Sequence, residues 1–360
     1  MSLLLSRFIG FGLRLYAVAF PDPLTNRAPY GTCSEGPNAL AWLKEEGSAE
    51  QTCIDWDGLQ RCWYRFVPNS VLLQQESKSV PVVIHLHGAG GCASLPSVGW
   101  GTLAEDNGFV VVWPQGTKHT LPFLPAILAN NLPVFALDLL GFNLNCWNDG
   151  SGLFGAEGAG IDDMGFLKAM VTQISAKPKV GGSSSDSKDE DVETSSVSID
   201  TSRIYMSGHS NGAVMAQRFA LQTNGLLAGV VSISGAALPN DPEWTPGGTS
   251  IGEYQSTPII LIAGTSDGVV PFYERAGPLA GAFPSFDGWA TINGCDATSR
   301  KEDGYGAFTQ YNYASCRGST QVTLLEVFDA GHHPFPKGTE PFQVSSKDTI
   351  ASKWFPPQQV

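Results

Sequence analysis

The sequence predicts an α/β protein with a mostly parallel central sheet and helices on both faces, for three reasons. Short runs rich in Val, Ile and Leu recur along the chain, at residues 81–87, 109–114, 203–208, 229–234, 258–264 and 322–328. These runs are apolar throughout instead of alternating with polar residues, which is typical of strands covered on both faces. Segments with helical spacing lie between them, and strands that alternate with helices indicate an α/β fold.

Two of the expected helices can be placed together with their ends. Residues 161–174 begin behind Asp162 or Asp163 as the N-cap. Their apolar side chains recur at the spacing of one helix face, at Met164, Leu167, Val171 and Ile174. Residues 211–223 form the second expected helix, and the Asn-Gly pair that follows them is a typical helix stop.

Composition and charge bound the size of the core and the class of partner. The chain has 360 residues, of which 42% are hydrophobic, so one large domain is expected. It carries 21 Lys and Arg against 34 Asp and Glu, which gives a formal net charge of −13. Such a charge repels phosphate backbones and anionic lipid headgroups. Nucleic acid is therefore not an expected partner.

Residues 1–19 are expected to form a cleaved export signal. They are apolar, lack acidic residues and end in an Ala-Val-Ala triplet that resembles a signal-peptidase site. An organelle transit peptide is the alternative, and the apolar runs are too short for a stable membrane anchor. The 7 cysteines favour export, because disulfides form in oxidising compartments. The expected organisation is an extension over 20–60, a main domain over 61–340 and a tail over 341–360.

Two insertions interrupt the main domain. Residues 119–145 form a long apolar connection, and we expect either a lid over a pocket or a buried extra helix. Residues 181–198 are acidic and contain no aromatic side chain. Because such a segment cannot bury enough apolar surface to offset its ordering entropy, we expect it to be disordered and solvated.

The candidate nucleophile is a serine in the pattern Gly-x-Ser-x-Gly, which occurs around Ser210, Ser250 and Ser266. In serine hydrolases of the α/β-hydrolase class, small residues let a strand turn sharply into a helix and expose the Ser hydroxyl. Only Ser210 has an expected strand before it and an expected helix after it. Ser250 follows a Pro-Gly pair in a loop, and the segment after Ser266 runs into Pro271, which cannot continue a helix. Ser210 is therefore the expected nucleophile.

The expected acid and base lie later in the chain, as the order Ser, acid, His of this class requires. Asp267 comes soon after the strand at residues 258–264 and is the expected acid. Only His332 and His333 follow it, on the loop after the last expected strand. A carboxylate that accepts from one imidazole nitrogen fixes the tautomer whose other nitrogen takes the Ser proton. The side chains must therefore converge at one edge of the sheet.

Acyl transfer also needs N–H donors for the developing oxyanion. The N–H of Asn211 follows the nucleophile and is the first expected donor. The second is the N–H of Ala89, in the His-Gly-Ala-Gly-Gly run that follows an early strand, where an ordinary glycine turn is the alternative. His85 and His87 share one strand face, but no nearby Asp or Cys completes a ligand set, so no metal is expected.

The motifs together resemble the secreted esterase family that includes polyhydroxybutyrate depolymerases and feruloyl or acetylxylan esterases. The similarity runs from Arg61 to Pro336, without the two insertions. It implies an α/β-hydrolase fold, a triad of Ser210, Asp267 and His332, and no cofactor. Its pieces are RCWYRFVP, HLHGAGG, CWNDG, DDMGFL, IYMSGHSNGA, AGTSDGVVPF, WATINGC, YASCRG and DAGHHPFP.

The resemblance extends to the cysteines and to the choice of histidine. It implies a disulfide between Cys295 and Cys316. We further expect Cys92 to pair with Cys146 near the mouth of the site, and we leave the other three cysteines unassigned. The family usually ends Gly-His-x-Trp-Pro, whereas this chain has a second His, an extra Pro and Phe in place of Trp. His332 keeps the family register and is the preferred base.

Trp147 and His87 are the expected substrate-binding residues. Trp147 and Trp289 would stack on a phenolic acyl group, with a place in the core as the alternative for large aromatic side chains. The sequence thus predicts an exported serine ester hydrolase that acts on a small or polymeric ester. A hydrolase-fold binding protein without catalysis and a serine peptidase of the same fold are the alternatives. The acyl and alcohol parts of the substrate are not determined.

Overall fold

The fold is seen in a computed structural model that describes residues 47–74, 79–93, 100–120, 143–176, 197–239, 254–273 and 280–333. The expected leader, most of the acidic insertion and the C-terminal tail lie outside these residues. Within the described part, no helix combines the length and the apolar character that a bilayer crossing requires.

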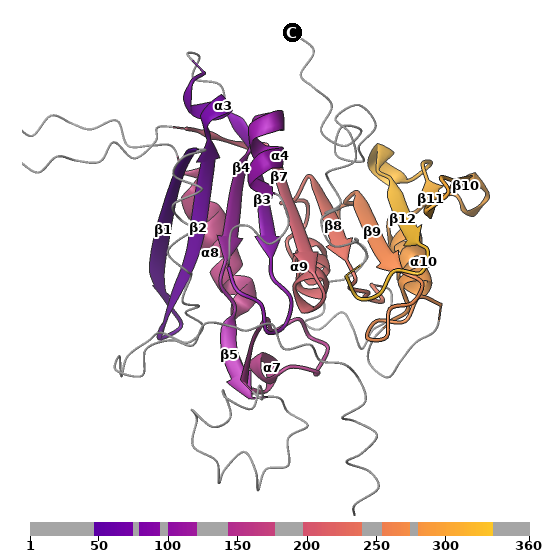
Figure 1. Cartoon of the computed structure of the whole chain (residues 1–360), viewed down its shortest axis with the longest axis horizontal. Coiled ribbons are helices and arrows are strands. Elements are labelled where there is room, and N and C mark those ends of the chain that lie inside the picture. The colour runs from indigo at the N-terminus through magenta and orange to yellow at the C-terminus, as the bar shows by residue number, and fades with distance from the viewer. Residues whose placement is uncertain are drawn as a thin grey trace, which may run out of the picture.

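A sheet of ten strands runs across the whole molecule (Figure 1). Its order is β1-β2-β4-β3-β7-β8-β9-β12-β11-β10. The strands are β1 (Gly47–Trp56), β2 (Leu59–Pro68), β3 (Val80–Leu86), β4 (Val110–Pro114), β7 (Ile199–His209), β8 (Gly229–Ile233), β9 (Ile259–Gly264), β10 (Arg300–Gly304), β11 (Phe308–Tyr313) and β12 (Val322–Val327).

The centre of the sheet is parallel and its two ends are antiparallel. Parallel pairs join β4 to β3, β3 to β7, β7 to β8, β8 to β9 and β9 to β12. Antiparallel pairs join β1 to β2, β2 to β4, β12 to β11 and β11 to β10. Strands β4 and β9 are buried along their full length, as their unbroken apolar sequences predict. The predicted α/β class is confirmed.

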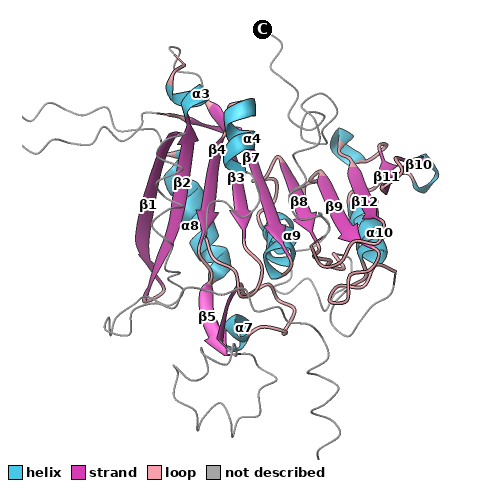
Figure 2. Ribbon diagram, in the orientation of Figure 1, coloured by secondary structure: helices cyan, strands magenta, loops and turns pink. Residues whose placement is uncertain are grey.

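Helices cover both faces of the sheet (Figure 2). Side chains of α8, α9 and α10 share the larger core cluster with Val82 and Ile84 of β3, whereas Val83 packs with α4 in a second cluster. The alternation follows from the two-residue period of a strand. The helices are α3 (Asn69–Leu72), α4 (Trp100–Asn107), α7 (Gly155–Gly158), α8 (Asp163–Ser175), α9 (Asn211–Gln222) and α10 (Ala282–Ile292), with 3-10 turns at Ala297–Ser299 and Arg317–Ser319.

The two helices placed from the sequence are confirmed within two residues at each end. Helix α8 starts behind Asp162, whose side chain caps it by accepting a hydrogen bond from the N–H of Gly165 at 2.8 Å. Helix α9 begins directly after Ser210. Its position at the end of β7 brings the helix N-terminus to the edge of the sheet where the parallel strands end.

The domain boundary expected at residue 61 is too late. Strand β1 starts at Gly47 and pairs with β2 over ten residues of each strand, so part of the expected extension belongs to the central sheet. A disulfide between Cys53 and Cys62 joins these two strands at directly opposed positions. The alternating exposure of β1 explains the error, because an edge strand with one solvated face lacks the unbroken apolar run of a central strand.

The apolar insertion is flanked by a short ladder. Strands β5 (Thr117–Thr120) and β6 (Asn143–Cys146) form a separate antiparallel pair, and the intervening residues 121–142 lie outside the described residues. The choice between a lid and a buried helix therefore stays a prediction. The ladder places the two ends of the insertion side by side.

The cysteine pairing expected near the site is wrong. Cys92 is disulfide-bonded, but Cys146 is a buried thiol and does not take part in that bond. Cys146 ends β6, where its backbone pairs with Thr117, and burial of its side chain in the core leaves it to the packing role of a small apolar residue. The disulfide between Cys295 and Cys316 is present, as the resemblance implied.

Candidate active site

Ser210 sits at a strained turn between β7 and α9. Its backbone has φ 52° and ψ −123°, a conformation that non-glycine residues rarely adopt and that costs on the order of 1–3 kcal/mol. The two glycines of the pattern make the turn possible. A Cβ at Gly208 would collide with the carbonyl of Gly212, and a Cβ at Gly212 would collide with the carbonyls at the end of β3. Glycine is therefore required at both positions of the motif, because neighbouring backbone atoms leave no room for a side chain.

The structure brings Ser210, His332 and Asp267 together in one chain of hydrogen bonds. The distance from His332 Nε2 to Ser210 Oγ is 2.9 Å, and the distance from His332 Nδ1 to Asp267 Oδ2 is also 2.9 Å. Ser210 follows β7, Asp267 follows β9 and His332 follows β12. The carboxyl ends of these strands share one edge of the parallel sheet. The Asp267 side chain is 1% exposed, whereas that of His332 is 20% exposed. The imidazole therefore lies between a buried carboxylate and a partly open hydroxyl.

The acid loop and the histidine loop are attached to each other through their backbones. The N–H of Ser266 donates to the carbonyl of Ala330 at 2.9 Å, and the N–H of Thr265 donates to the carbonyl of Val327 at 2.9 Å. A Cβ at Gly264 would collide with the Ala330 carbonyl, so glycine permits this close approach. The relative position of the two loops is consequently set before any side chain is considered.

Asp267 is held in its charged form. Burial alone would raise its pKa, but the hydrogen bond from His332 and the two bonds that Asp267 Oδ1 accepts from the N–H groups of Val269 and Val270 outweigh burial, so the pKa is lowered. A carboxylate in this position orients the imidazole and stabilises its protonated form.

His333 does not face the serine. Its ring stacks on His209, with centroids 4.6 Å apart and planes 12° apart. His209 in turn lies within hydrogen-bond distance of the His332 carbonyl, with its Nε2 3.0 Å from that oxygen. Burial lowers the pKa of His209 to about 3, more than this hydrogen bond raises it. The ring is therefore neutral, and the geometry assigns its N–H to Nε2, which donates to the carbonyl.

The expected oxyanion donors are the N–H groups of Asn211 and Ala89, which lie in two separate segments of the chain. Asn211 is the first residue of α9, and the first N–H groups of a helix have no acceptor within the helix. In the loop after β3, the N–H groups of Gly90 and Gly91 already donate, to the carbonyls of Asn145 and Gly88 respectively. The N–H of Ala89 stays the expected second donor.

The expected substrate-binding roles of Trp147 and His87 are wrong. Trp147 is 0% exposed, and its indole N–H donates to the His87 carbonyl at 2.9 Å. His87 is also buried, with Nδ1 against the Gly88 carbonyl and Nε2 accepting from the N–H of Gly116. Trp289 is buried as well and donates to Gln217. The two tryptophans are buried because their large apolar rings gain most from leaving water, and a place in the core was the alternative expected for them.

Sequence reasoning missed a buried carboxylate at Asp149. It is 2% exposed and accepts hydrogen bonds from the side chain of Asn211 at 2.6 Å and from the N–H and hydroxyl of Ser151. The only sequence signal was its place in the motif CWNDG. Among the described residues, no group of three or more His, Cys, Asp or Glu is placed to hold a metal ion.

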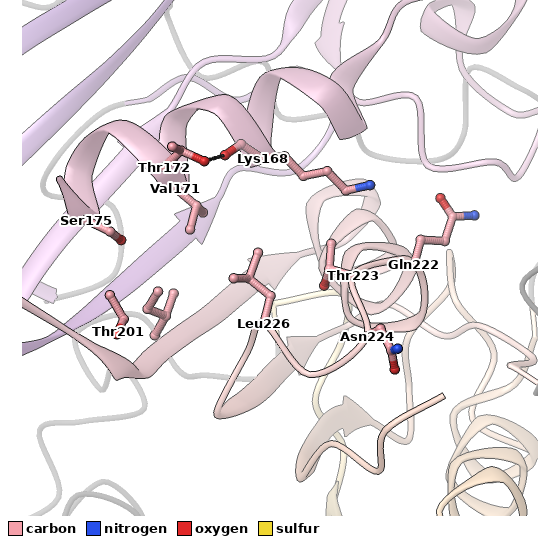
Figure 3. Close-up of a pocket in the computed structure, with 10 residues that line it drawn as sticks. Lys168, Val171, Thr172, Ser175, Thr201, Gln222, Thr223, Asn224 and Leu226 are labelled. Atoms are coloured by element: carbon pink, nitrogen blue, oxygen red, sulfur yellow. Dashed lines mark hydrogen bonds between the residues drawn. The ribbon is translucent and has the colours of Figure 1, made fainter. Parts of the chain in front are cut away.

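A groove of about 460 Å³ opens far from these residues (Figure 3). It lies between the end of α8, the end of α9 and the start of β7, and Leu226 projects into it. Since α9 has 12 residues and rises about 1.5 Å per residue, its two ends are about 18 Å apart. Ser210 precedes the opposite end of that helix, so the groove is not the reaction site.

The strand order and the Ser, His and Asp set at the carboxyl edge of the sheet define an α/β-hydrolase. The sequence family described as Phospholipase/Carboxylesterase matches residues 184–277, a segment that contains Ser210 and Asp267. The topology, the side-chain set and this match together support a carboxylic ester hydrolase.

Solved structures of low sequence identity align with this chain. An acetyl xylan esterase from Aspergillus awamori aligns with a TM-score of 0.48 and 16% identity, over 86% of this chain and 99% of that one. An S-formylglutathione hydrolase from Agrobacterium tumefaciens aligns at 0.41 and 14%, over 80% and 90%. A ferulic acid esterase aligns at 0.33 and 13%, over 62% and 81%. A search of curated protein sequences finds no significant match.

Proposed function

We propose that this chain is an exported serine esterase that works through an acyl-enzyme intermediate. The observation that carries the proposal is the unbroken path from the Ser210 hydroxyl through His332 to Asp267, with both hydrogen bonds at 2.9 Å. This arrangement activates a serine that is otherwise a weak nucleophile. Export is supported by the disulfides of the described residues, since such bonds persist in oxidising compartments.

The reaction begins when Ser210 Oγ attacks the ester carbonyl carbon and its proton passes to His332 Nε2. Asp267 accepts a hydrogen bond from the Nδ1–H of His332 and stabilises the imidazolium, while the proton stays on Nδ1. The carbonyl oxygen gains the negative charge and lies between the N–H groups of Ala89 and Asn211. When the tetrahedral intermediate collapses, the alkoxide leaves with the proton held by His332, and the acyl group stays on Ser210.

Deacylation repeats the same steps with water. His332 Nε2 removes a proton from a water molecule, whose oxygen attacks the acyl carbon of the Ser210 ester. The second tetrahedral intermediate expels Ser210 Oγ, which recovers its proton from His332. The products are one carboxylic acid and one alcohol. No group other than the side chains and peptide N–H groups named here is needed.

We further propose that the substrates are of the polyhydroxybutyrate depolymerase or feruloyl esterase type. The support is the set of motifs around Arg61, Cys146 and Asp162, which lies outside the triad and resembles those enzymes over the length of the domain. A screen of short acyl esters, methyl ferulate, acetylated xylan and hydroxyalkanoate film would select among them. Turnover of amide substrates but not esters would instead favour a peptidase.

The direct test is Ser210→Ala with Ser266→Ala as its matched control, because Ser266 is the other described serine within a Gly-x-Ser-x-Gly pattern and is exposed. We expect Ser210→Ala to lower p-nitrophenyl ester turnover by a factor on the order of 10⁴ or more. It should also abolish labelling by a fluorophosphonate, with an unchanged circular dichroism spectrum. Ser266→Ala should keep full activity. A wild-type protein that neither turns over esters nor takes the label would indicate a binding protein.

A further inference from the structure

The two proposed oxyanion donors come from segments far apart in the sequence. Ala89 lies in the loop after β3, and Asn211 opens α9. For both N–H groups to reach one oxygen, their separation must be held to a fraction of an ångström, because misplacing a catalytic contact by about 1 Å can cost roughly 10²-fold in rate. A third segment, residues 145–149, contacts both halves. We call it the brace.

On one side the brace holds the loop that carries Ala89. Hydrogen bonds reach this loop both before and after Ala89, so the peptide is fixed from two directions. They run from the N–H of Gly90 to the carbonyl of Asn145 (2.8 Å), from Asn145 Nδ2 to the carbonyl of Gly91 (3.0 Å), and from Trp147 Nε1 to the carbonyl of His87 (2.9 Å).

On the other side the brace holds the side chain of Asn211. Asn211 Oδ1 accepts from the N–H of Trp147 at 2.7 Å, and Nδ2 donates to the Trp147 carbonyl at 3.1 Å. Nδ2 also donates to Asp149 Oδ2 at 2.6 Å. Because one end of the amide faces a donor and the other faces two acceptors, its orientation is fixed. Asn211 is 2% exposed, so these bonds form away from water.

The brace is itself anchored to the core. The N–H of Asn148 donates to Asp163 Oδ2 at 2.7 Å, and Asp163 forms a buried ion pair with Arg61. From α9, Arg218 donates to the carbonyl of Asn148 at 2.7 Å. A segment tied at so many points cannot shift without breaking buried hydrogen bonds, and each buried polar group left unpaired costs about 1–3 kcal/mol.

We propose that the brace sets the distance between the two halves of the oxyanion hole, with Trp147 and Asp149 as positioning residues. Trp147 is the central member of the brace. Its indole N–H donates to His87, at the start of the loop that carries Ala89, and its backbone bonds the side chain of Asn211. Asp149 fixes which end of the Asn211 amide faces the brace. This inference rests on the proposed function, because it assigns a role within the same reaction.

The test compares Trp147→Phe with Trp289→Phe. Both tryptophans are fully buried and donate the indole N–H, but Trp147 donates to the carbonyl of His87 beside the Ala89 loop, whereas Trp289 donates to the side chain of Gln217. We expect Trp147→Phe to lower kcat by about 10- to 100-fold, which is less than the roughly 10²–10³-fold loss that follows removal of an oxyanion donor itself. KM should change by less than about threefold. Trp289→Phe should keep kcat within about twofold at a similar loss of stability.

Two further readouts separate positioning from general damage. Inhibition by a trifluoromethyl ketone, which forms a tetrahedral adduct with the serine, should weaken by the same factor as kcat in Trp147→Phe. The pH dependence of kcat should stay as in the wild type, because His332, the proposed base, is not substituted. Asp149→Asn is the second variant, and it should show the same pattern if Trp147→Phe does not fold.

The outcomes are decisive in each case. Equal kcat in Trp147→Phe and Trp289→Phe would overturn the inference while leaving the esterase proposal intact. A loss of kcat with unchanged binding of the trifluoromethyl ketone would also overturn it, because the defect would then lie outside the oxyanion hole. A wild-type protein without ester turnover or fluorophosphonate labelling would remove both proposals together.

Discussion

The two groups of residues next to Ser210 differ in their exposure to solvent. On the oxyanion side, Trp147, Asp149 and Asn211 are at most 2% exposed and are linked by short side-chain hydrogen bonds. On the base side, the His332 ring is 20% exposed. The difference follows from the two tasks. Donors for a developing charge act best when they are already in place and shielded from water, whereas the base must exchange protons with substrate and water in every cycle.

The base side reaches its precision in another way. The loops that carry Asp267 and His332 are joined by backbone hydrogen bonds, and the ring of His332 is partly exposed. On the oxyanion side, the side chains themselves are held by buried hydrogen bonds. Substitutions on the two sides should therefore differ in kind, with losses of proton transfer on one side and losses of oxyanion stabilisation on the other.

The largest expected effect on the base side is that of His332→Ala. Without an acceptor for the Ser210 proton, we expect kcat to fall by a factor on the order of 10⁶, because the remaining groups provide only binding and oxyanion contacts. Steady-state turnover of a p-nitrophenyl ester measures the loss. Activity within tenfold of the wild type would show that another group serves as the base.

A smaller effect on kcat is expected at His209. This residue directly precedes Ser210, and its ring bonds the carbonyl of His332. His209→Phe keeps a ring to stack on His333 but loses the donor to the His332 carbonyl. We expect kcat to fall roughly tenfold, since the His332 backbone gains freedom at the point where small displacements are costly. His209→Gln retains an N–H donor and should recover part of the loss. A fully active Phe variant would show that this bond does not position the base.

Acid should weaken the fold on the buried side of the site. Burial lowers the pKa of His85 to about 3 and that of His87 to about 4, whereas an unfolded chain titrates near 6.5. Between these limits the unfolded state binds more protons, so stability falls as pH decreases from about 6.5 towards 4. Each histidine contributes up to about 1.4 kcal/mol per pH unit.

Urea unfolding at pH 7, 6 and 5 measures this dependence. The free energy of unfolding should decrease with pH over that range, and the decrease should be shallower in His85→Gln, which removes one titrating group. A free energy that stays constant from pH 7 to pH 5 would contradict the prediction.

The smallest effect is expected for His333→Ala. The His333 side chain is exposed and its ring stacks on His209, whereas the ring that bonds Ser210 is that of His332. We expect kcat and KM to stay within about twofold of the wild type. A loss comparable to that of His332→Ala would reverse the assignment of the two histidines that the structure indicates.

Much of the site is a property of local sequence. The strand before Ser210, the glycines around it and the helix after it are consecutive in the chain, so their pattern predicts the sharp turn that the structure contains. Asp267 could be placed for the same reason, because it follows an unbroken apolar strand. The first strand of the sheet was missed because its exposed face breaks that pattern.

Other features depend on contacts between distant segments. Chain order allowed His332 or His333 to serve as base, and the folded loop turns only His332 towards Ser210. The pairing expected for Cys92 and Cys146 failed because spacing along the chain does not report which thiols meet in space.

The sequence alone determined the α/β class and the residues proposed as nucleophile and acid, since each depends on a few consecutive residues whose backbone preferences are local. Only the tertiary structure decided that Trp147 is fully buried and bonded to His87, and that Asp149 is bonded to Asn211. The physical reason is burial. Whether a tryptophan or a carboxylate is covered, and by which partner, depends on the packing of segments that no local pattern connects.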